Sequence, residues 1–180
     1  MVEFLTTKGT AAEIENIIRN ANKWLVVISP YVNLSANFLE RLQDADRRNV
    51  AIFIVCKEGA LELGERNKLQ QLKLKNLSLM SHKDLHAKSY VNEDCLVITS
   101  MNIYQYSEKN REMGILIRKS EDERVFLEAA KEVDSIIHSS TKDDLMVTKD
   151  KHAFPSHRNE PAGYCIRCRT PIPLDLYMMS

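Results

Sequence analysis

The stretch WLVVISPY, residues 24–31, decides the class of fold. Five apolar residues open it, three of them β-branched, and Pro30 ends the run. A short apolar run without polar alternation indicates a strand that is buried on both of its faces. Such a strand lies inside a sheet that helices cover on both sides, so we expect helices in the flanking sequence.

Helical and extended segments alternate on both sides of this run. A short strand is predicted at residues 3–6, and Thr10 is predicted to cap the helix that follows, with Glu13 completing a capping box. Apolar residues then recur at helical spacing, at Ile14, Ile17, Ile18 and Ala21. Ser35 is predicted to cap a second helix, and VAIFIVC, residues 50–56, predicts another buried strand.

The second half of the chain continues this pattern with more strands. We predict a helix in residues 60–76, strands in 77–80, 85–91, 95–99 and 112–117, and a last helix that starts after Ser120 and ends near His138. Together these elements predict an α/β fold, in which an open mixed β-sheet is flanked by helices on both faces.

Length, charge and apolar content limit the classes of protein. A chain of 180 residues suits one main domain with a tail. Lys and Arg total 25, as do Asp and Glu, so no overall basic field indicates nucleic acid or an acidic membrane. We expect no membrane span and a cytoplasmic protein, or else an exported protein whose signal has been removed.

Composition divides the chain into three predicted parts. Residues 1–140 form the main domain, 141–162 a polar linker, and 163–180 a short tail. Cys165 and Cys168 have the spacing of half a zinc knuckle, but no second pair follows. They could bind a structural zinc ion, with His152 and His157 as further ligands, or remain a free or disulfide-prone pair.

Polar residues interrupt apolar strands in LHAKSYVNEDCLVITSMN, residues 85–102. Residues two apart on a strand point to the same face, so His86 and Lys88 are expected to project together. Ser100 and Asn102 repeat that spacing at the end of the next strand, and all four side chains are expected to reach one pocket.

This set of groups suits cleavage of a phosphodiester without a metal ion. His86 is the candidate nucleophile, and Lys88, Asn102 and Ser100 are candidate donors to the phosphoryl oxygens. An imidazole attacks when its other ring nitrogen is held, and Glu112 is the carboxylate that we expect to hold it.

These motifs resemble the HKD motif of the phospholipase D superfamily, HxKxxxxD followed by GSxN. Glu93 occupies the acidic position, with Asp94 next to it, so either could take the acidic role. The interval to Ser100 is one residue short, and Thr99 replaces the usual glycine. The strands at residues 24–31 and 50–56 extend the resemblance over roughly Phe4 to His138.

The resemblance implies a mechanism and an oligomeric state. In that superfamily the motif histidine forms a phosphohistidine, and the histidine of a second motif protonates the leaving oxygen. One motif is present here, as in bacterial nucleases that pair two copies across a twofold axis. The expected protein is a metal-independent, homodimeric phosphodiesterase acting on nucleic acid, with no cofactor in catalysis and an unidentified partner protein as a further possibility.

Two alternatives remain open at this point. The same residues could hydrolyse a phospholipid or another small phosphodiester. The fold could instead serve as a noncatalytic nucleic-acid-binding module with a degenerate motif, because the segment between Lys88 and Ser100 is shortened.

Overall fold

The computed structural model describes residues 1–103, 110–143, 163–164 and 171–172. Its helices and strands follow one another along the chain as β1 (Glu3–Thr6), α1 (Thr7–Asn20), β2 (Trp24–Ile28), α2 (Ala36–Arg47), β3 (Ala51–Lys57), α3 (Leu63–Leu72), β4 (Leu77–His82), β5 (Ser89–Asn92), β6 (Cys95–Thr99), β7 (Met113–Arg118), α4 (Glu123–Ser139), β8 (Thr141–Lys142), β9 (Gly163–Tyr164) and β10 (Pro171–Ile172).

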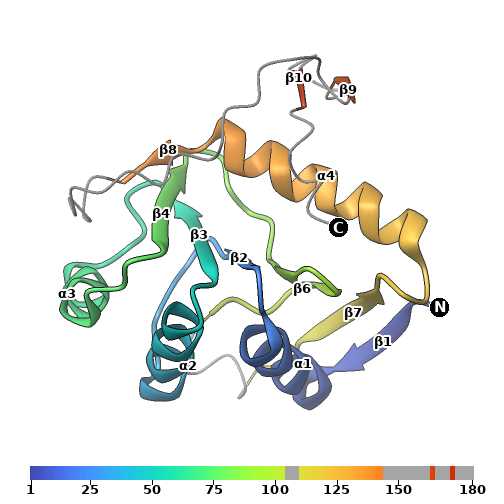
Figure 1. Cartoon of the computed structure of the whole chain (residues 1–180), viewed down its shortest axis with the longest axis horizontal. Coiled ribbons are helices and arrows are strands. Elements are labelled where there is room, and N and C mark those ends of the chain that lie inside the picture. The colour runs from blue at the N-terminus through green and yellow to red at the C-terminus, as the bar shows by residue number, and fades with distance from the viewer. Residues whose placement is uncertain (104–109, 144–162, 165–170, 173–180) are drawn as a thin grey trace.

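The described part of the chain is built on an eight-stranded mixed sheet in the order β1-β7-β6-β5-β2-β3-β4-β8 (Figure 1). Strands β2, β3 and β4 run parallel. Strand β5 pairs antiparallel with β2, and β6, β7 and β1 continue antiparallel to one edge. The sheet is therefore the mixed sheet that the sequence predicted.

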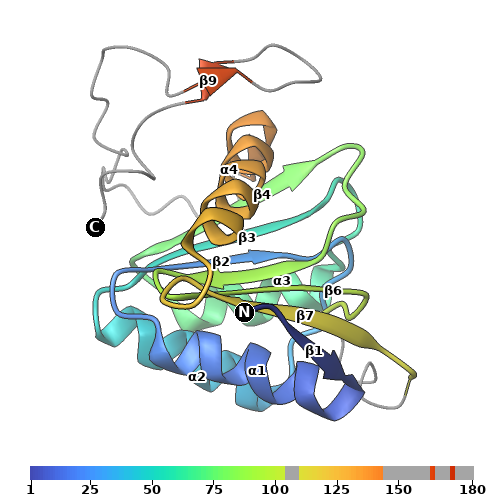
Figure 2. The same cartoon turned by 90° about the vertical axis from the view of Figure 1, so that its right-hand side faces the viewer.

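Helices cover both faces of this sheet, as predicted. Figure 2 shows α1, α2 and α3 on one side of the sheet and α4 on the other. The five residues of β2 are all buried, and they alternate between the two cores. Leu25 and Val27 pack in the core with α1 and α2, whereas Trp24, Val26 and Ile28 pack in the core with α4. Double burial explains why this strand carries no polar alternation.

Helix α1 begins one turn earlier than the capping pattern predicted. Thr6 is the N-cap residue, and Thr10 lies inside the helix, fully buried, with no hydrogen-bond partner for its hydroxyl in the described part of the chain. The prediction that Thr10 caps this helix was therefore wrong. Strand β1 runs directly into the helix, and α1 packs so closely on β7 that a Cβ added to Gly114 would lie 3.0 Å from the Thr10 hydroxyl.

The other predicted caps and stripes agree with the structure. Ser35 caps α2 by accepting a hydrogen bond from the Phe38 amide at 3.2 Å. Ile14, Ile17 and Ile18 form the buried stripe of α1. The third helix, Leu63–Leu72, is shorter than the predicted segment 60–76 at both ends.

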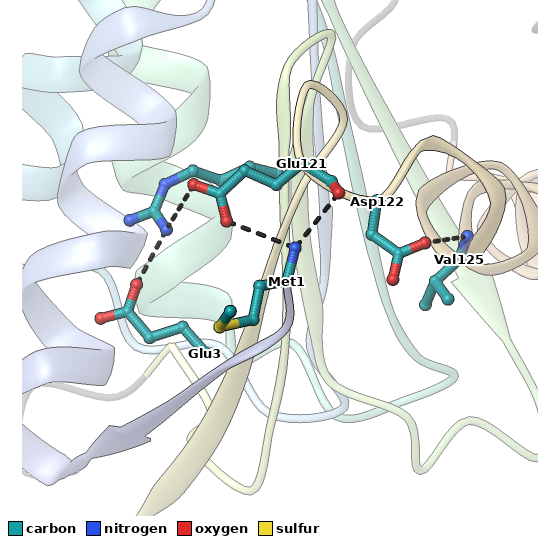
Figure 3. A network of polar contacts seen from close by, with 6 residues as sticks. Met1, Glu3, Glu121, Asp122 and Val125 are labelled. Atoms are coloured by element: carbon teal, nitrogen blue, oxygen red, sulfur yellow. Dashed lines mark hydrogen bonds and ion pairs between the residues drawn. The ribbon is translucent and has the colours of Figure 1, made fainter.

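A polar network ties β1 to the turn that precedes α4 (Figure 3). The Met1 amino group donates to the Glu121 carbonyl oxygen at 3.2 Å and lies 3.5 Å from the Glu121 carboxylate. Arg118 donates to Glu3 at 2.8 Å across the β1–β7 pair. Asp122 caps α4 through its side chain. These groups are largely exposed, so the network contributes little to the stability of the fold.

Several sequence predictions fall on residues that the structure does not describe. Cys165, Cys168, His152 and His157 lie outside the described residues, so the zinc prediction and the three-part division of the chain stay predictions. Among the described residues, no group of three or more His, Cys, Asp or Glu side chains is placed to hold a metal ion. None of the described helices is long and apolar enough to cross a membrane.

Candidate active site

The candidate site lies at one edge of the sheet, where four strands begin or end. The register pairs the end of β2 with the start of β5, since Ile28 lies opposite Ser89. The end of β6 pairs with the start of β7, and Thr99 lies opposite Gly114. Polar residues that are distant in sequence therefore meet here.

Ser100 and Glu112 are joined directly. The Ser100 hydroxyl donates a short hydrogen bond to the Glu112 carboxylate and accepts one from the Met113 amide at 3.2 Å. Thr7 holds the Glu112 backbone from the first turn of α1: its hydroxyl donates to the Glu112 carbonyl at 3.0 Å and accepts from the Glu112 amide at 2.9 Å. The carboxylate thus projects from a backbone that is bonded on both sides.

Lys88 lies within electrostatic reach of this pair. Its ammonium group donates to the His86 carbonyl oxygen at 2.9 Å. Partial burial lowers the pKa of Lys88 below its usual value, and the negative charge of Glu112 partly offsets that shift. A partly desolvated cation beside a carboxylate is suited to bind a phosphoryl oxygen.

His86 precedes the strand on which the sequence placed it. Strand β5 begins at Ser89, so His86 and Lys88 lie in the irregular segment before it, and the predicted strand at residues 85–91 started too early. The His86 side chain is exposed, and Lys88 is half-buried. In the described part of the chain no hydrogen bond joins His86 to Glu112, whose carboxylate contacts Ser100 instead.

Asn102 follows Ser100 beyond the end of β6, in a segment held by side chains from other strands. The Tyr90 hydroxyl donates to the Met101 carbonyl at 3.0 Å, and the Ser29 hydroxyl accepts from the Ile103 amide at 3.0 Å. Asn102 also borders a cavity of about 170 Å³ between α1 and α2, and its amide oxygen is buried without a partner in the described residues.

The two acidic residues in the motif lie elsewhere. Glu93 directly follows the last residue of β5, whereas Lys88 directly precedes the first. The Glu93 carboxylate accepts hydrogen bonds from the amides of Asn22 at 2.8 Å and Lys23 at 3.4 Å. Asp94 adjoins it in the turn to β6, where its amide donates to the Asn92 side chain at 3.0 Å. In the geometry of this chain both residues are turn residues, remote from the edge that carries Lys88, Ser100 and Glu112.

Thr99, which replaces the usual glycine of the motif, has a structural role that the motif alone did not indicate. Its hydroxyl donates to the Met113 carbonyl at 2.7 Å and accepts from the Met101 amide at 3.0 Å. The Thr99 side chain thus links the end of β6 to the backbone of β7 and to the Met101 amide. The sequence patterns did not identify Thr7, Ser29 or Tyr90 as residues that support the site. The signal that could have identified them is a hydroxyl side chain at the border of an apolar run.

The site therefore combines an exposed imidazole, a partly desolvated ammonium group, a hydroxyl on a carboxylate, and an amide at one edge of a mixed sheet. These groups can offer a nucleophile and several donors to a tetrahedral phosphorus centre. Fold and site together define a phospholipase D-type α/β domain.

Comparison with known families agrees with this class. Residues 14–149 match the family described as "Cardiolipin synthase, PLD-like domain". Because that match spans most of the sequence, the chain belongs to the phospholipase D-like family of phosphodiesterases. No match to a curated protein is found.

Solved structures show the same fold at low sequence identity. The phospholipase D family member Nuc from Salmonella typhimurium is 15% identical, with a TM-score of 0.62, and the match covers 79% of this chain and 96% of Nuc. NucT from Helicobacter pylori is 12% identical, with a TM-score of 0.67 and coverage of 79% and 99%. A phosphatidylserine synthase from Haemophilus influenzae is 15% identical, with a TM-score of 0.60 and coverage of 76% of this chain but 35% of the synthase.

Proposed function

We propose that this chain is a metal-independent nuclease, which cleaves DNA or RNA phosphodiester bonds at a site shared between two copies of the chain. The observation that carries the proposal is the cluster of Lys88, Ser100 and Glu112 beside the exposed His86. Lys88 and Asn102 would bind the non-bridging phosphoryl oxygens, and Ser100 would add a donor.

The reaction would take place in two steps. A ring nitrogen of His86 attacks phosphorus, the N–P bond forms, and the P–O bond to the leaving group breaks. His86 of the second copy donates a proton to the leaving oxygen. Water then attacks phosphorus, the N–P bond breaks, and the imidazole of the second copy takes the proton of the water. Glu112 is proposed to orient an imidazole at the assembled site.

Two considerations favour nucleic acid over lipid as the substrate. The match spans nearly all of Nuc and NucT but 35% of the phosphatidylserine synthase. In size this chain therefore resembles the single-domain Nuc and NucT more than it resembles the synthase. The archaeal chromatin protein TrmBL2, described as binding DNA, shares the fold at 14% identity and a TM-score of 0.60, over 79% of this chain and 54% of TrmBL2. Since the net charge is zero, we expect binding to single strands or ends rather than strong nonspecific binding to duplexes.

An exposed apolar row supports the homodimer. Ile115 of β7 pairs with Phe4 of β1 on one side and with Ile98 of β6 on the other, so the three side chains share one face of the sheet. Met113 lies two residues before Ile115 on the same face. Their exposed fractions are 67% for Phe4, 60% for Met113, 47% for Ile98 and 43% for Ile115. The row adjoins Ser100 and Glu112, where a second copy would complete the site.

Cleavage assays in excess chelator test this function. Wild-type chain is expected to cut labelled single-stranded or double-stranded DNA or RNA, and His86→Ala is expected to lose more than about a thousandfold of this activity, because the nucleophile is gone. A phosphoryl adduct trapped on His86 would identify the nucleophile directly.

His82→Ala is the matched control. His82 ends β4, which β2 and β3 separate from β5 in the sheet, and it accepts a hydrogen bond from the Asp84 amide at 3.2 Å. This variant should keep wild-type cleavage. Equal background cleavage by wild type and His86→Ala would exclude the nuclease and favour a noncatalytic binding module. Cleavage of phospholipid vesicles alone would favour the lipid hydrolase.

A further inference from the structure

The backbone on both sides of Asn102 is held at every polar group. The Met101 amide donates to Thr99, and the Met101 carbonyl accepts from Tyr90. The Ile103 amide donates to Ser29, and the Ile103 carbonyl accepts from the Asn33 amide at 2.7 Å. Asn102 therefore sits between two residues whose amide and carbonyl groups are all bonded. Such a segment has little freedom to move its middle side chain.

Two of these four bonds come from buried side chains in the centre of the sheet. Ser29 follows β2 and Tyr90 belongs to β5, and both are 0% exposed. The Ser29 hydroxyl also donates to the Tyr31 carbonyl at 2.8 Å, which fixes its orientation as an acceptor for Ile103. Burial raises the pKa of Tyr90 well above its usual value, so its hydroxyl stays a donor.

We propose that Tyr90 and Ser29 are positioning residues, which hold Asn102 at the distance from Lys88 that a bound phosphoryl group requires. Tyr90 lies two residues after Lys88 on the same chain segment. One segment thus places Lys88 directly and Asn102 through the Tyr90 hydroxyl. This inference rests on the proposed function and adds the means by which the shortened segment before Ser100 keeps its geometry.

Removing single hydroxyl groups tests the proposal. Tyr90→Phe and Ser29→Ala are expected to lower kcat about threefold to tenfold with little change in KM, because one hydrogen bond to the Asn102 segment is lost in each. In the Asn102→Ala background, Tyr90→Phe should change kcat by less than about twofold, since the group that it positions is absent. An equal loss in both backgrounds would overturn the proposal.

Ser89→Ala is the matched control for loss of a buried hydrogen bond. The Ser89 hydroxyl is buried beside Tyr90 in β5, but it donates to the Val97 carbonyl at 3.1 Å and not to the Asn102 segment. Its kcat should stay at the wild-type value under conditions where all variants are folded. A loss in Ser89→Ala as large as that in Tyr90→Phe would show general destabilisation and overturn the proposal.

A measurement without turnover separates this inference from the nuclease itself. In NMR spectra, Tyr90→Phe and Ser29→Ala should shift the Asn102 side-chain amide signals, and Ser29→Ala should speed hydrogen exchange of the Ile103 amide about tenfold or more. Ser89→Ala should do neither. If the wild-type chain cleaves no phosphodiester, the proposed function fails. Asn102 signals unmoved by both substitutions overturn the positioning role whether or not cleavage is seen.

Discussion

At the scale of single residues, the site depends on the electrostatic balance around Lys88. Burial disfavours the charged form of Lys88, while Glu112 favours it. Glu112 is itself tied to Ser100, so the same carboxylate orients a hydroxyl and supports a cation. In a partly desolvated site each of these effects is larger than it would be at an exposed surface.

Glu112→Gln is predicted to move the alkaline limb of the pH profile to lower pH. Lys88 must be protonated to bind a phosphoryl oxygen, and Glu112 raises its pKa. Removing that charge lowers the pKa further, so the ammonium is lost at a lower pH. Glutamine keeps an oxygen for Ser100. The measurement is kcat/KM against pH, with Glu128→Gln on the exposed face of α4 as control. An alkaline limb that stays in place would contradict the coupling.

At the scale of elements, the junction of β1 and α1 builds one wall of the site. Thr6 ends β1 and Thr7 begins α1 without an intervening loop. The Thr7 hydroxyl forms hydrogen bonds with the Glu112 backbone. The Thr10 hydroxyl, one turn later, is buried against Gly114 without a partner in the described residues. Two threonines of the same helix thus have opposite energetic roles.

Substituting these threonines by valine is predicted to change stability in opposite directions. Thr10→Val should raise the free energy of unfolding by about 1 kcal/mol, because it removes an unpaired buried hydroxyl at nearly constant volume. Thr7→Val should lower it by about 1–3 kcal/mol, because the Glu112 amide loses its acceptor. Denaturant unfolding of both variants checks this. Helix propensity differs little between the two residue types, so equal losses in both would contradict the assignment.

At the scale of the whole molecule, the two faces of the sheet are covered unequally near the site. Helix α4 follows β7 in the chain. It covers Ile117, near the carboxyl end of β7, which packs in the same hydrophobic core as the buried face of α4. Met113 and Ile115, nearer the start of the strand, remain exposed beside Phe4 and Ile98. An apolar row next to the candidate site is a suitable contact surface for a second copy of the chain, as the proposed shared site requires.

Ile115→Lys is predicted to give a monomer and to reduce cleavage to near the level of His86→Ala. A charge in the middle of the row would be buried without a partner in the dimer. Sedimentation measures the association, and the cleavage assay measures the consequence. Leu63→Lys is the control, because Leu63 is 78% exposed in α3, away from the row. An Ile115→Lys chain that remains a fully active dimer would show that the copies meet elsewhere.

Local sequence patterns were enough to predict the α/β class. The doubly buried strand at Trp24–Ile28, the stripe of α1 and the Ser35 cap all follow from residues that are close in sequence. Two-residue spacing and family resemblance predicted that His86, Lys88, Ser100 and Asn102 share one pocket, but His86 and Lys88 precede β5, and Ser100 and Asn102 follow β6. Their chemical roles in the reaction stay predictions.

Contacts between distant segments decided the rest. The start of α1 depends on β1 and on Glu112, 105 residues from Thr7, so a local capping pattern at Thr10 could not locate it. Lys88 precedes β5 and Glu93 follows it. The four residues of this strand therefore hold Glu93 away from the site. The bonds from Ser29 and Tyr90 to the Asn102 segment form only when β2, β5 and β6 lie side by side. Spacing along a strand specifies a direction for a side chain, whereas its partner depends on which strands become neighbours.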